Sequence, residues 1–314
     1  MNKLLLAALI SGAMAVPTFA ADYSIMAPAA PGGGWDQTAR TMQEALQAEG
    51  ISGNVQVTNV PGAGGTIGLA QFVNQSNANP NALIVGGYVM VGAILTNASP
   101  VTLEQVTPIA RLTGEAVALV VPASSDIQTV DDLVAKLNEN VGAVSWAGGS
   151  AGGADHITAG LITKAVGADP TQVNYIAYSG GGEALAAVLG GQVTVGISGY
   201  SEFASQIEAG ELRLLAVSTA ERVPGVDAPT LQEAGVDVAV QNWRMVAAAP
   251  GITEEQKAAI SSDIEKMVDS ATWQAALESR GWVNTYLAGA DFDAQLAEDI
   301  AATDAILREI GLVQ

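Results

Sequence analysis

The chain has 314 residues, with 32 acidic against 12 basic side chains, a net charge of −20, no cysteine and one histidine. A field this negative repels nucleic acid and anionic lipid, which excludes both as partners. The lack of cysteine excludes disulfides and lipid-attachment thiols, and with a single histidine there is little to build a metal site. We therefore expect neither a metal nor a cofactor.

The first twenty residues have the pattern of a secretory signal peptide. Lys3 supplies the positive start, residues 4–16 are apolar, and Thr18-Phe19-Ala20 is a small-x-small cleavage signal. The apolar part is too short to cross a bilayer, and no later stretch reaches the roughly 18 to 20 uncharged apolar residues that a membrane helix needs. We expect a soluble, exported protein in the periplasm of a bacterium with an outer membrane. The part that remains is long enough for two domains or one large one.

Strands and helices alternate along the first two thirds of the remaining chain, with glycine-rich loops between them. Apolar or alternating runs predict strands over 23–26, 53–60, 82–85, 116–121, 144–147, 173–178, 193–197 and 212–217. Helical patterns follow over 35–46, 66–73, 130–137, 155–166, 183–189 and 202–208. This alternation predicts an α/β fold with parallel sheets flanked by helices.

The carboxyl-terminal stretch is different, because it reads as consecutive amphipathic helices. Thr253-Glu254-Glu255 gives a capping signal, and helices are predicted over 254–270, 271–280 and 291–310. We expect these helices to pack against a sheet formed earlier in the chain.

Four glycine-rich loops connect a predicted strand to a predicted helix, at 28–35, 61–65, 148–153 and 179–182. Loops at the carboxyl ends of parallel strands gather at one sheet edge, where ligands bind. The unpaired N–H groups at a helix start favour negative charge, and glycine lets them close on a carboxylate or phosphate. The four loops together predict an anion site made of main-chain donors, although each loop alone also reads as a tight turn.

Enzyme motifs are weak in this sequence. Residues 148–152 match the G-x-S-x-G pattern around Ser150, but a hydrolase triad needs a histidine later in the chain. The one histidine, His156, is six residues on and in the same predicted helix. No Gly-Lys-Ser or Gly-Lys-Thr follows any glycine loop, so a P-loop is excluded. The glycines at 62, 64 and 68 are a weak match to a dinucleotide motif. Calcium binding by Asp155, Glu183 and Glu202 is the alternative to their being solvated first-turn acids.

Several spaced motifs resemble one known family over essentially the whole mature chain. Ala27 to Asp36 fits P-x-x-P-G-G-x-x-D, Asn59 to Gly65 fits N-x-P-G-A-G-G, and Tyr178 to Val193 contains Y-x-G-G-G and L-G-G-x-V. The chain resembles the Bug-type extracytoplasmic solute receptors of the tripartite tricarboxylate transporter family, and looks most similar to the tricarboxylate-receptor branch.

The resemblance implies a type II periplasmic binding protein fold with two lobes, each a mixed, mostly parallel sheet flanked by helices. Carried onto this chain, lobe I is residues 22–116 plus 242–314, and lobe II is residues 117–241. Two crossover strands near 112–117 and 238–244 form the hinge. It also implies a monomer that is not an enzyme.

In such receptors a carboxylated solute lies between the lobes, held by main-chain amides of the facing loops. The solute, a tricarboxylate such as citrate or a dicarboxylate, is then delivered to a permease of one large and one small membrane subunit. The corresponding candidate residues of lobe I are Ala30, Gly32, Gly33, Gly34, Trp35, Asp36, Gly64, Thr66 and Tyr88. Those of lobe II are Gly149, Ser150, Ala151, Gly152, Asp155, His156, Tyr178, Gly181, Gly182, Glu183, Gly199, Tyr200 and Ser201.

One departure from the tricarboxylate branch concerns positive charge. Only Arg111 and Arg244, near the crossovers, are placed to neutralise a solute, which makes a mono- or dicarboxylate a strong competitor to citrate. Two alternatives stay open from the sequence: a periplasmic serine hydrolase using Ser150 and His156, and a lobe that hands its ligand to a signalling partner.

Overall fold

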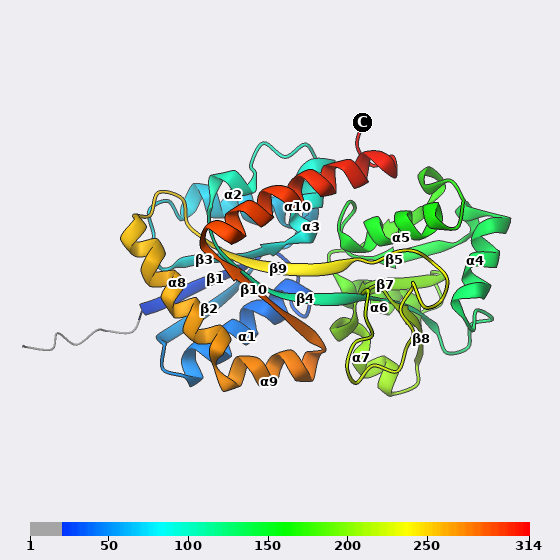
Figure 1. Ribbon diagram of the computed structural model, residues 1–314, viewed down its shortest axis with the longest axis horizontal. Helices are drawn as coiled ribbons and strands as arrows, with labels where there is room; N and C mark the ends of the chain where they lie inside the picture. Colours follow the sequence, from blue (N-terminus) through cyan, green and yellow to red (C-terminus); the bar gives the residue numbers. More distant parts are fainter. Residues whose placement is uncertain (1–20) are drawn as a thin grey trace, which may run out of the picture.

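Two strands run between the two halves of the molecule in the computed structural model, which describes residues 21–314 (Figure 1). These strands are β4 (Thr107–Pro122) and β9 (Gln241–Ala248). Up to Ala116, β4 pairs with β9, and from Val117 it pairs with β7 and β8. The change of partners falls where the resemblance puts the hinge. The expected signal peptide lies in residues 1–20, outside the described part of the chain.

Lobe I is built on one part of the sheet and holds the start of the described chain. Its strand order is β2 (Ser52–Asn59), β1 (Ala21–Ala27), β3 (Ala82–Gly87), β9 and β4, with β10 (Trp282–Ala288) paired to β4. Its helices are α1 (Gly34–Ala48), α2 (Thr66–Gln75), α3 (Tyr88–Thr96), α8 (Glu254–Asp269), α9 (Ala271–Arg280) and α10 (Gly289–Glu309).

Lobe II repeats this plan on the other half of β4. Its strands are β6 (Asn174–Ala177), β5 (Ser145–Gly148), β7 (Val195–Gly199) and β8 (Leu212–Val217). Its helices are α4 (Val130–Glu139), α5 (Ala154–Ala165), α6 (Gly181–Leu189) and α7 (Tyr200–Glu208). Short 3-10 turns are Ala63–Gly65, Leu103–Gln105, Val141–Ala143 and Pro170–Gln172.

The sheet is mixed in a regular way. Among the described strands, every pair that contains β4 or β9 is antiparallel, and the four pairs that contain neither are parallel. The parallel pairs come from the strand-loop-helix units, whose helices return the chain to the same sheet edge. The α/β, two-lobed fold expected from the sequence is confirmed, with antiparallel pairing concentrated at the crossovers.

The predicted helices and strands are present, most with ends that differ by a few residues, and β9 lies close to the crossover strand that the resemblance put near 238–244, but α3 and β10 were not predicted. Residues 88–96 form α3 although they are nearly all apolar, because the helix lies in the interior and shows no polar face. β4 extends well beyond the predicted 116–121, since its first half contains polar residues that the apolar-run criterion rejects.

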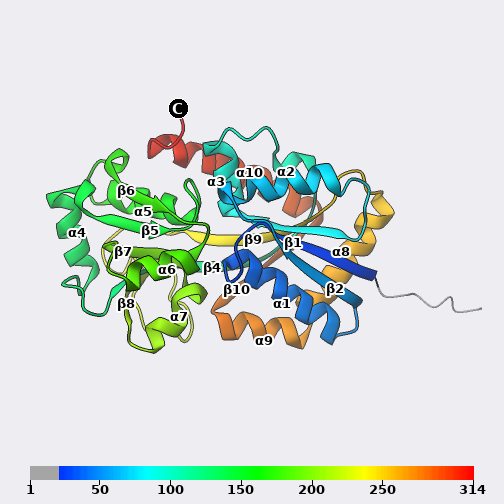
Figure 2. The same ribbon diagram turned by 180° about the vertical axis from the view of Figure 1, so that it is seen from behind.

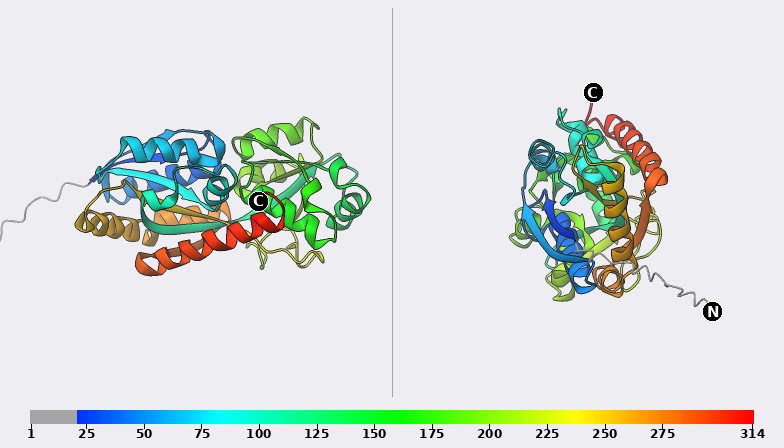
Figure 3. Two further views of the ribbon diagram at one scale, coloured as in Figure 1. Left: turned by 90° about the horizontal axis from the view of Figure 1, so that it is seen from above. Right: turned by 90° about the vertical axis from the view of Figure 1, so that its left-hand side faces the viewer.

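The last helix reaches both lobes. In the view from above, α10 runs along the molecule from lobe I toward lobe II (Figure 3). Just after its end, the Ile310 side chain lies 2.9 Å from where a Cβ on Gly160 of α5 would be, and Glu309 forms an ion pair with Lys164 of α5. The resemblance implies that this segment belongs to lobe I. The contacts with α5 place the end of the segment at the boundary between the two lobes. Among the described residues, no helix is long and apolar enough to cross a membrane.

Candidate functional site: the cleft between the lobes

A small cavity of about 60 Å³, called here the inner cavity, lies between the two lobes. Its lobe I residues are Pro28, Ala29, Gly33, Gly34, Trp35, Gly62, Gly64, Gly65, Val89, Asn242 and Arg244. Its lobe II residues are Gly149, Ser150, Asp155, Ser179, Gly180, Gly181, Ser198 and Glu202. All four glycine loops singled out in the sequence contribute to this wall.

A second and wider space, the outer cavity, adjoins the first and has a volume of about 340 Å³. The two share Gly62, Gly64, Ser150 and Ser179. The other residues of the outer cavity are Ala63, Asn97, Ala151, Ala177, Tyr178 and Glu183. The cleft therefore continues from the inner cavity toward Tyr178 and Glu183.

The lobes touch each other around these cavities through glycines. A Cβ on Gly92 of α3 would overlap the carbonyl oxygen of Gly152, and a Cβ on Gly180 would lie 3.7 Å from the Cα of Gly33. Figure 2 shows the starts of α1 and α6 meeting at the junction of the lobes. A side chain at Gly92 would hold the two main chains apart, so glycine is required there, whereas a Cβ on Gly180 would make an ordinary van der Waals contact.

Most helices that follow a glycine loop carry a first-turn acid that binds the N–H groups of its own loop. Asp36 of α1 accepts a hydrogen bond from Gly32 N at 2.8 Å, and Asp155 of α5 accepts one from Gly149 N at 2.8 Å. Glu183 of α6 accepts one from Ser179 N at 3.0 Å. These carboxylates therefore accept hydrogen bonds from main-chain N–H groups that the sequence predicts as donors to the solute.

Glu202 in the first turn of α7 behaves differently, because its carboxylate reaches across the cleft. One oxygen, Oε1, accepts hydrogen bonds from Gly34 N in lobe I and from Gly181 N in lobe II, both at 3.1 Å. The other, Oε2, accepts from the Ser198 hydroxyl at 2.7 Å. A side chain of the protein therefore links the starts of α1 and α6.

A buried ion pair lies next to Glu202. Arg244 of β9 and Glu115 of β4 are 1% and 0% exposed, and Arg244 Nη2 contacts Glu115 Oε2. Glu115 Oε1 also accepts a hydrogen bond from Ser201 N at 2.7 Å, which places an acid at the start of α7. Arg244 Nη1 is buried and has no hydrogen-bond partner among the described residues. Arg244 thus brings a guanidinium with spare donor capacity to the wall of the inner cavity.

The acids of the inner cavity hold their protons more tightly than usual. Burial, aided by the charges of Glu202 and Glu115, raises the pKa of Asp155 to about 7. Burial and the charge of Glu115 also raise the pKa of Glu202. Asp155 Oδ1 is buried and has no hydrogen-bond partner within residues 21–314. The expectation that Asp155 is a solvated first-turn acid is wrong, since it is buried; Glu202 is half-buried, and Glu183 is exposed as expected.

The candidate site residues divide into three groups by position. Lining the inner cavity are Gly33, Gly34, Trp35, Gly64, Gly149, Ser150, Asp155 and Gly181. Lining the outer cavity are Ala151, Tyr178 and Glu183, together with Gly64 and Ser150. Outside both walls are Ala30, Gly32, Asp36, Thr66, Tyr88, Gly152, His156, Gly182, Gly199, Tyr200 and Ser201.

Asp36 and Thr66 support the loops of lobe I. Burial would raise the pKa of Asp36, but hydrogen bonds from Arg40, Gly32 N and Asn59 outweigh it and leave that pKa below its usual value. Asn59 also donates to Ala29 O at 3.0 Å, so this network fixes the first glycine loop. The Thr66 hydroxyl donates to Ala63 O at 2.8 Å and shapes the second loop.

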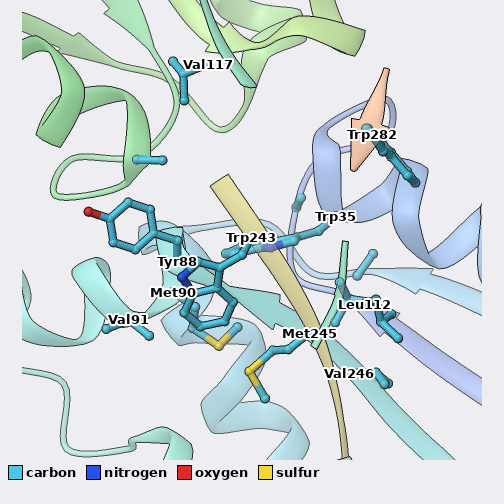
Figure 4. Close-up of a cluster of buried hydrophobic side chains, with 14 of the residues drawn as sticks. Trp35, Tyr88, Met90, Val91, Leu112, Val117, Trp243, Met245, Val246 and Trp282 are labelled. Atoms are coloured by element: carbon cyan, nitrogen blue, oxygen red, sulfur yellow. The ribbon is translucent and has the colours of Figure 1, made fainter. Parts of the chain in front are cut away.

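Tyr88 belongs to the hydrophobic interior. It is 8% exposed and stacks on Trp243 with ring centroids 6.4 Å apart (Figure 4). Burial and the charge of Asp299 raise the pKa of its phenol to about 12. The phenol lines a separate cavity together with Asp299.

His156 is held on the lobe II side of the cleft. Its Nδ1 accepts a hydrogen bond from Gly152 N at 3.2 Å, and its ring stacks on Tyr175 at 4.1 Å. Burial lowers the pKa of the imidazole to about 4. Because His156 accepts a hydrogen bond from Gly152 and stacks on Tyr175, and no hydrogen bond to Ser150 is present among the described residues, the geometry does not support the serine hydrolase alternative.

Of the remaining residues outside the cavity walls, three lie where lobe II approaches the hinge and three lie in the glycine loops at 28–35 and 179–182. Gly199 packs against the Glu115 carboxylate, Ser201 donates its N–H to that carboxylate, and Tyr200 lies near Gly281 of lobe I. Gly182 and Gly32 are exposed, and Ala30 O accepts a hydrogen bond from Gly33 N.

Sequence reasoning missed Glu115, Ser198 and Asn242, and it considered Glu202 as a calcium ligand or a solvated acid but did not predict that its carboxylate links the two lobes. A signal existed for the buried ion pair: Glu115 and Arg244 each stand alone in an apolar crossover segment, GEAVALVV and NWRMVAA. A charged residue in such a run is buried with its neighbours and needs a partner. Ser198 and Asn242 carry no such signal, since their position depends on how the strands pair.

Comparison with known proteins agrees with this architecture. Residues 38–312 match the model of the tripartite tricarboxylate transporter family receptor. The chain belongs to this family. Members of this family are receptors, and the two-lobed fold is shared with the solved structure of the periplasmic binding protein BugD, which superposes with a TM-score of 0.84 at 20% identity.

Two curated relatives and one solved structure illustrate the breadth of the receptor family. Protein BugT of Bordetella pertussis is 27% identical over 91% of this chain and 88% of its own length. A protein of Agrobacterium vitis, named for the TAR-I ttuE-ttuC' intergenic region, is 27% identical over 70% of this chain, which spans 63% of that relative. The structure of MatC from Rhodopseudomonas palustris with bound malate superposes with a TM-score of 0.80 at 22% identity, covering 93% of this chain and 100% of that one.

Proposed function

We propose that this receptor binds a small organic carboxylate in the cleft and delivers it to a permease with one large and one small membrane subunit. The observation that carries the proposal is Arg244 in the wall of the inner cavity, because one of its guanidinium nitrogens is buried without a partner in the described chain. An unpartnered buried guanidinium nitrogen costs free energy, and a carboxylate oxygen provides the acceptor that it needs.

Polar groups that surround Arg244 support the same chemistry. Asn242 of β9 and the Ser150 hydroxyl line the inner cavity with it, so amide and hydroxyl donors accompany the guanidinium. Trp35 and Val89 give the cavity an apolar side. This combination of few polar groups and an apolar wall is typical of small-molecule sites.

The charge of the site favours a mono- or dicarboxylate over citrate. Within the described lining of both cavities, Arg244 is the one basic side chain, while Asp155, Glu202 and Glu183 are acidic. A triply charged solute would meet one positive charge and several negative ones. MatC, which has the same fold, is described with malate, a dicarboxylate.

Titration calorimetry and thermal shift against malate, succinate, adipate, terephthalate, citrate and glutamate test the proposal. We expect at least one mono- or dicarboxylate to bind and to raise the melting temperature, with citrate weaker. If citrate binds most tightly, the charge argument fails. If none of these acids binds, the carboxylate assignment fails.

Delivery to a permease is tested in cells. We expect uptake of the radiolabelled solute to require both this receptor and the two membrane subunits. Binding with no change in uptake when the receptor is removed would favour the signalling role instead.

A further inference from the structure

We propose that Glu202 is a tethered anion: its carboxylate occupies the position between Gly34 N and Gly181 N where a solute carboxylate is held, and the solute displaces it on binding. The displacement rests on the proposed function. The occupation of the position is independent of it.

The geometry around Glu202 Oε1 is that of a bound anion. Two main-chain N–H groups, one from each lobe, donate to this single oxygen at 3.1 Å. Both belong to the first residue of a helix, Gly34 of α1 and Gly181 of α6, where donors have no partner inside the helix. Donors of this kind from two facing helix starts converge on a place suited to carboxylate oxygen.

The Glu202 carboxylate can extend to Gly34 N and Gly181 N because Glu115 accepts the main-chain hydrogen bond at the start of α7. In α6, Glu183 stands at the third helical position and accepts the N–H of Ser179 from its own loop. Glu202 stands at the same position of α7, but Glu115 already accepts Ser201 N at the start of that helix. Two residues at equivalent helix positions therefore differ in what their carboxylates bind.

The charges that face Glu202 come from three other elements. Glu115 of β4 and Asp155 of α5 are negative, and Arg244 of β9 is positive. A second carboxylate brought beside Glu202 would raise the local negative charge further. A solute anion at Gly34 N and Gly181 N must therefore replace the Glu202 carboxylate, because the two cannot share these donors.

Acetate is the probe that shows whether the Glu202 carboxylate fills an anion site or only supports the fold. Changing Glu202 to Ala removes the CH₂ and carboxylate of the side chain, a fragment of the size of acetate. We expect sodium acetate to raise the melting temperature of Glu202→Ala by several degrees more than sodium chloride at the same concentration and pH. The unchanged protein and Glu183→Ala, the matched control, should show no such difference.

A second variant keeps the test informative if Glu202→Ala is poorly folded. Glu202→Gln keeps the shape of the side chain and removes its charge, which weakens its hydrogen bonds with Gly34 N and Gly181 N. We expect Glu202→Gln to bind malate about tenfold more tightly than the unchanged protein does.

The possible outcomes distinguish this inference from the proposed function. Acetate stabilisation of Glu202→Ala, with no carboxylate bound by the unchanged protein, would support the tethered anion and contradict the carboxylate receptor. Malate binding that both Glu202 variants weaken, with no acetate effect, would overturn the tethered anion and make Glu202 a direct contact of the solute.

Discussion

The two arginines of the crossover strands have similar surroundings and face different parts of the molecule. Arg111 of β4 pairs with Asp299 at 3.3 Å and stacks on Trp243 at 5.1 Å, while Arg244 of β9 pairs with Glu115 and stacks on Trp282 at 5.0 Å. The Arg111 side chain is 15% exposed, whereas that of Arg244 is 1% exposed and lines the inner cavity. Nearness to the hinge along the sequence therefore does not identify a residue of the cleft, because the face of the sheet decides which arginine lines the inner cavity.

The largest expected effect is that of Arg244→Met. This change leaves Glu115 as an uncompensated buried charge, and removing one partner of a buried pair costs about 3–5 kcal/mol in the free energy of unfolding. It also removes the positive charge of the cavity, so malate binding should be lost. Urea unfolding and calorimetry measure the two effects.

The double variant Arg244→Met with Glu115→Gln is the control for folding. It should recover much of the lost stability, because neither charge remains buried alone, yet it should not recover binding. Full recovery of malate affinity in the double variant would show that Arg244 supports the fold without touching the solute.

A smaller effect, of opposite sign, is expected for Asp155→Asn. The pKa of Asp155 is about 7 in the folded protein, against an ordinary value of 3.8, so the folded state binds more protons between these values. Stability therefore falls as the pH rises from about 4 to 7, and Asn does not titrate. The variant should match the unchanged protein below pH 4 and exceed it by about 1–3 kcal/mol above pH 7, since a buried charge with an unsatisfied oxygen is gone.

Asp36→Asn is the matched control for the effect of pH. The pKa of Asp36 is lowered in the folded protein, so its charge contributes stability above its unfolded pKa and that contribution is lost as the pH falls. Asp36→Asn should thus lower stability at pH 7, where Asp155→Asn raises it. Unfolding curves from pH 4 to 8 compare the two variants. If both variants change the free energy of unfolding at pH 7 in the same direction, the surroundings described for Asp155 and Asp36 are wrong.

Gly34→Ala tests how closely the first glycine loop approaches Arg244. A Cβ at Gly34 would overlap Arg244 Nη2, whereas a Cβ at Gly182 of α6 meets nothing within 4 Å. Gly34→Ala should cost about 1–3 kcal/mol, as overpacking does, and should weaken malate binding. Gly182→Ala should be neutral or stabilise α6 by about 0.5–1 kcal/mol. Equal effects of the two changes on binding would argue against a specific contact at Gly34.

The sequence predicted the strand-loop-helix units and the four glycine loops of the cleft, because local periodicity and turn residues determine those features. It did not predict which N–H groups stay available, since the partners of Gly34 and Gly181 come from Glu202, 168 and 21 residues away. It also could not separate Arg111 from Arg244. Both depend on strand pairing across the hinge, and the antiparallel partners of β4 and β9 are far apart in the chain.

The smallest effect is expected for Arg111→Met, which gives the sharpest check of the difference between the two arginines. Its ion pair with Asp299 is partly exposed, and Gln295 also donates to Asp299 at 3.1 Å, so the acid keeps a partner and some solvent. Breaking a pair of this kind changes stability by about 1 kcal/mol or less. Malate affinity, measured by calorimetry beside Arg244→Met, should stay within about twofold, because Arg111 lies outside both cavity walls. If Arg111→Met loses binding as completely as Arg244→Met, the solute charge is neutralised from the Trp243 face, and the inner cavity is not where the carboxylate lies.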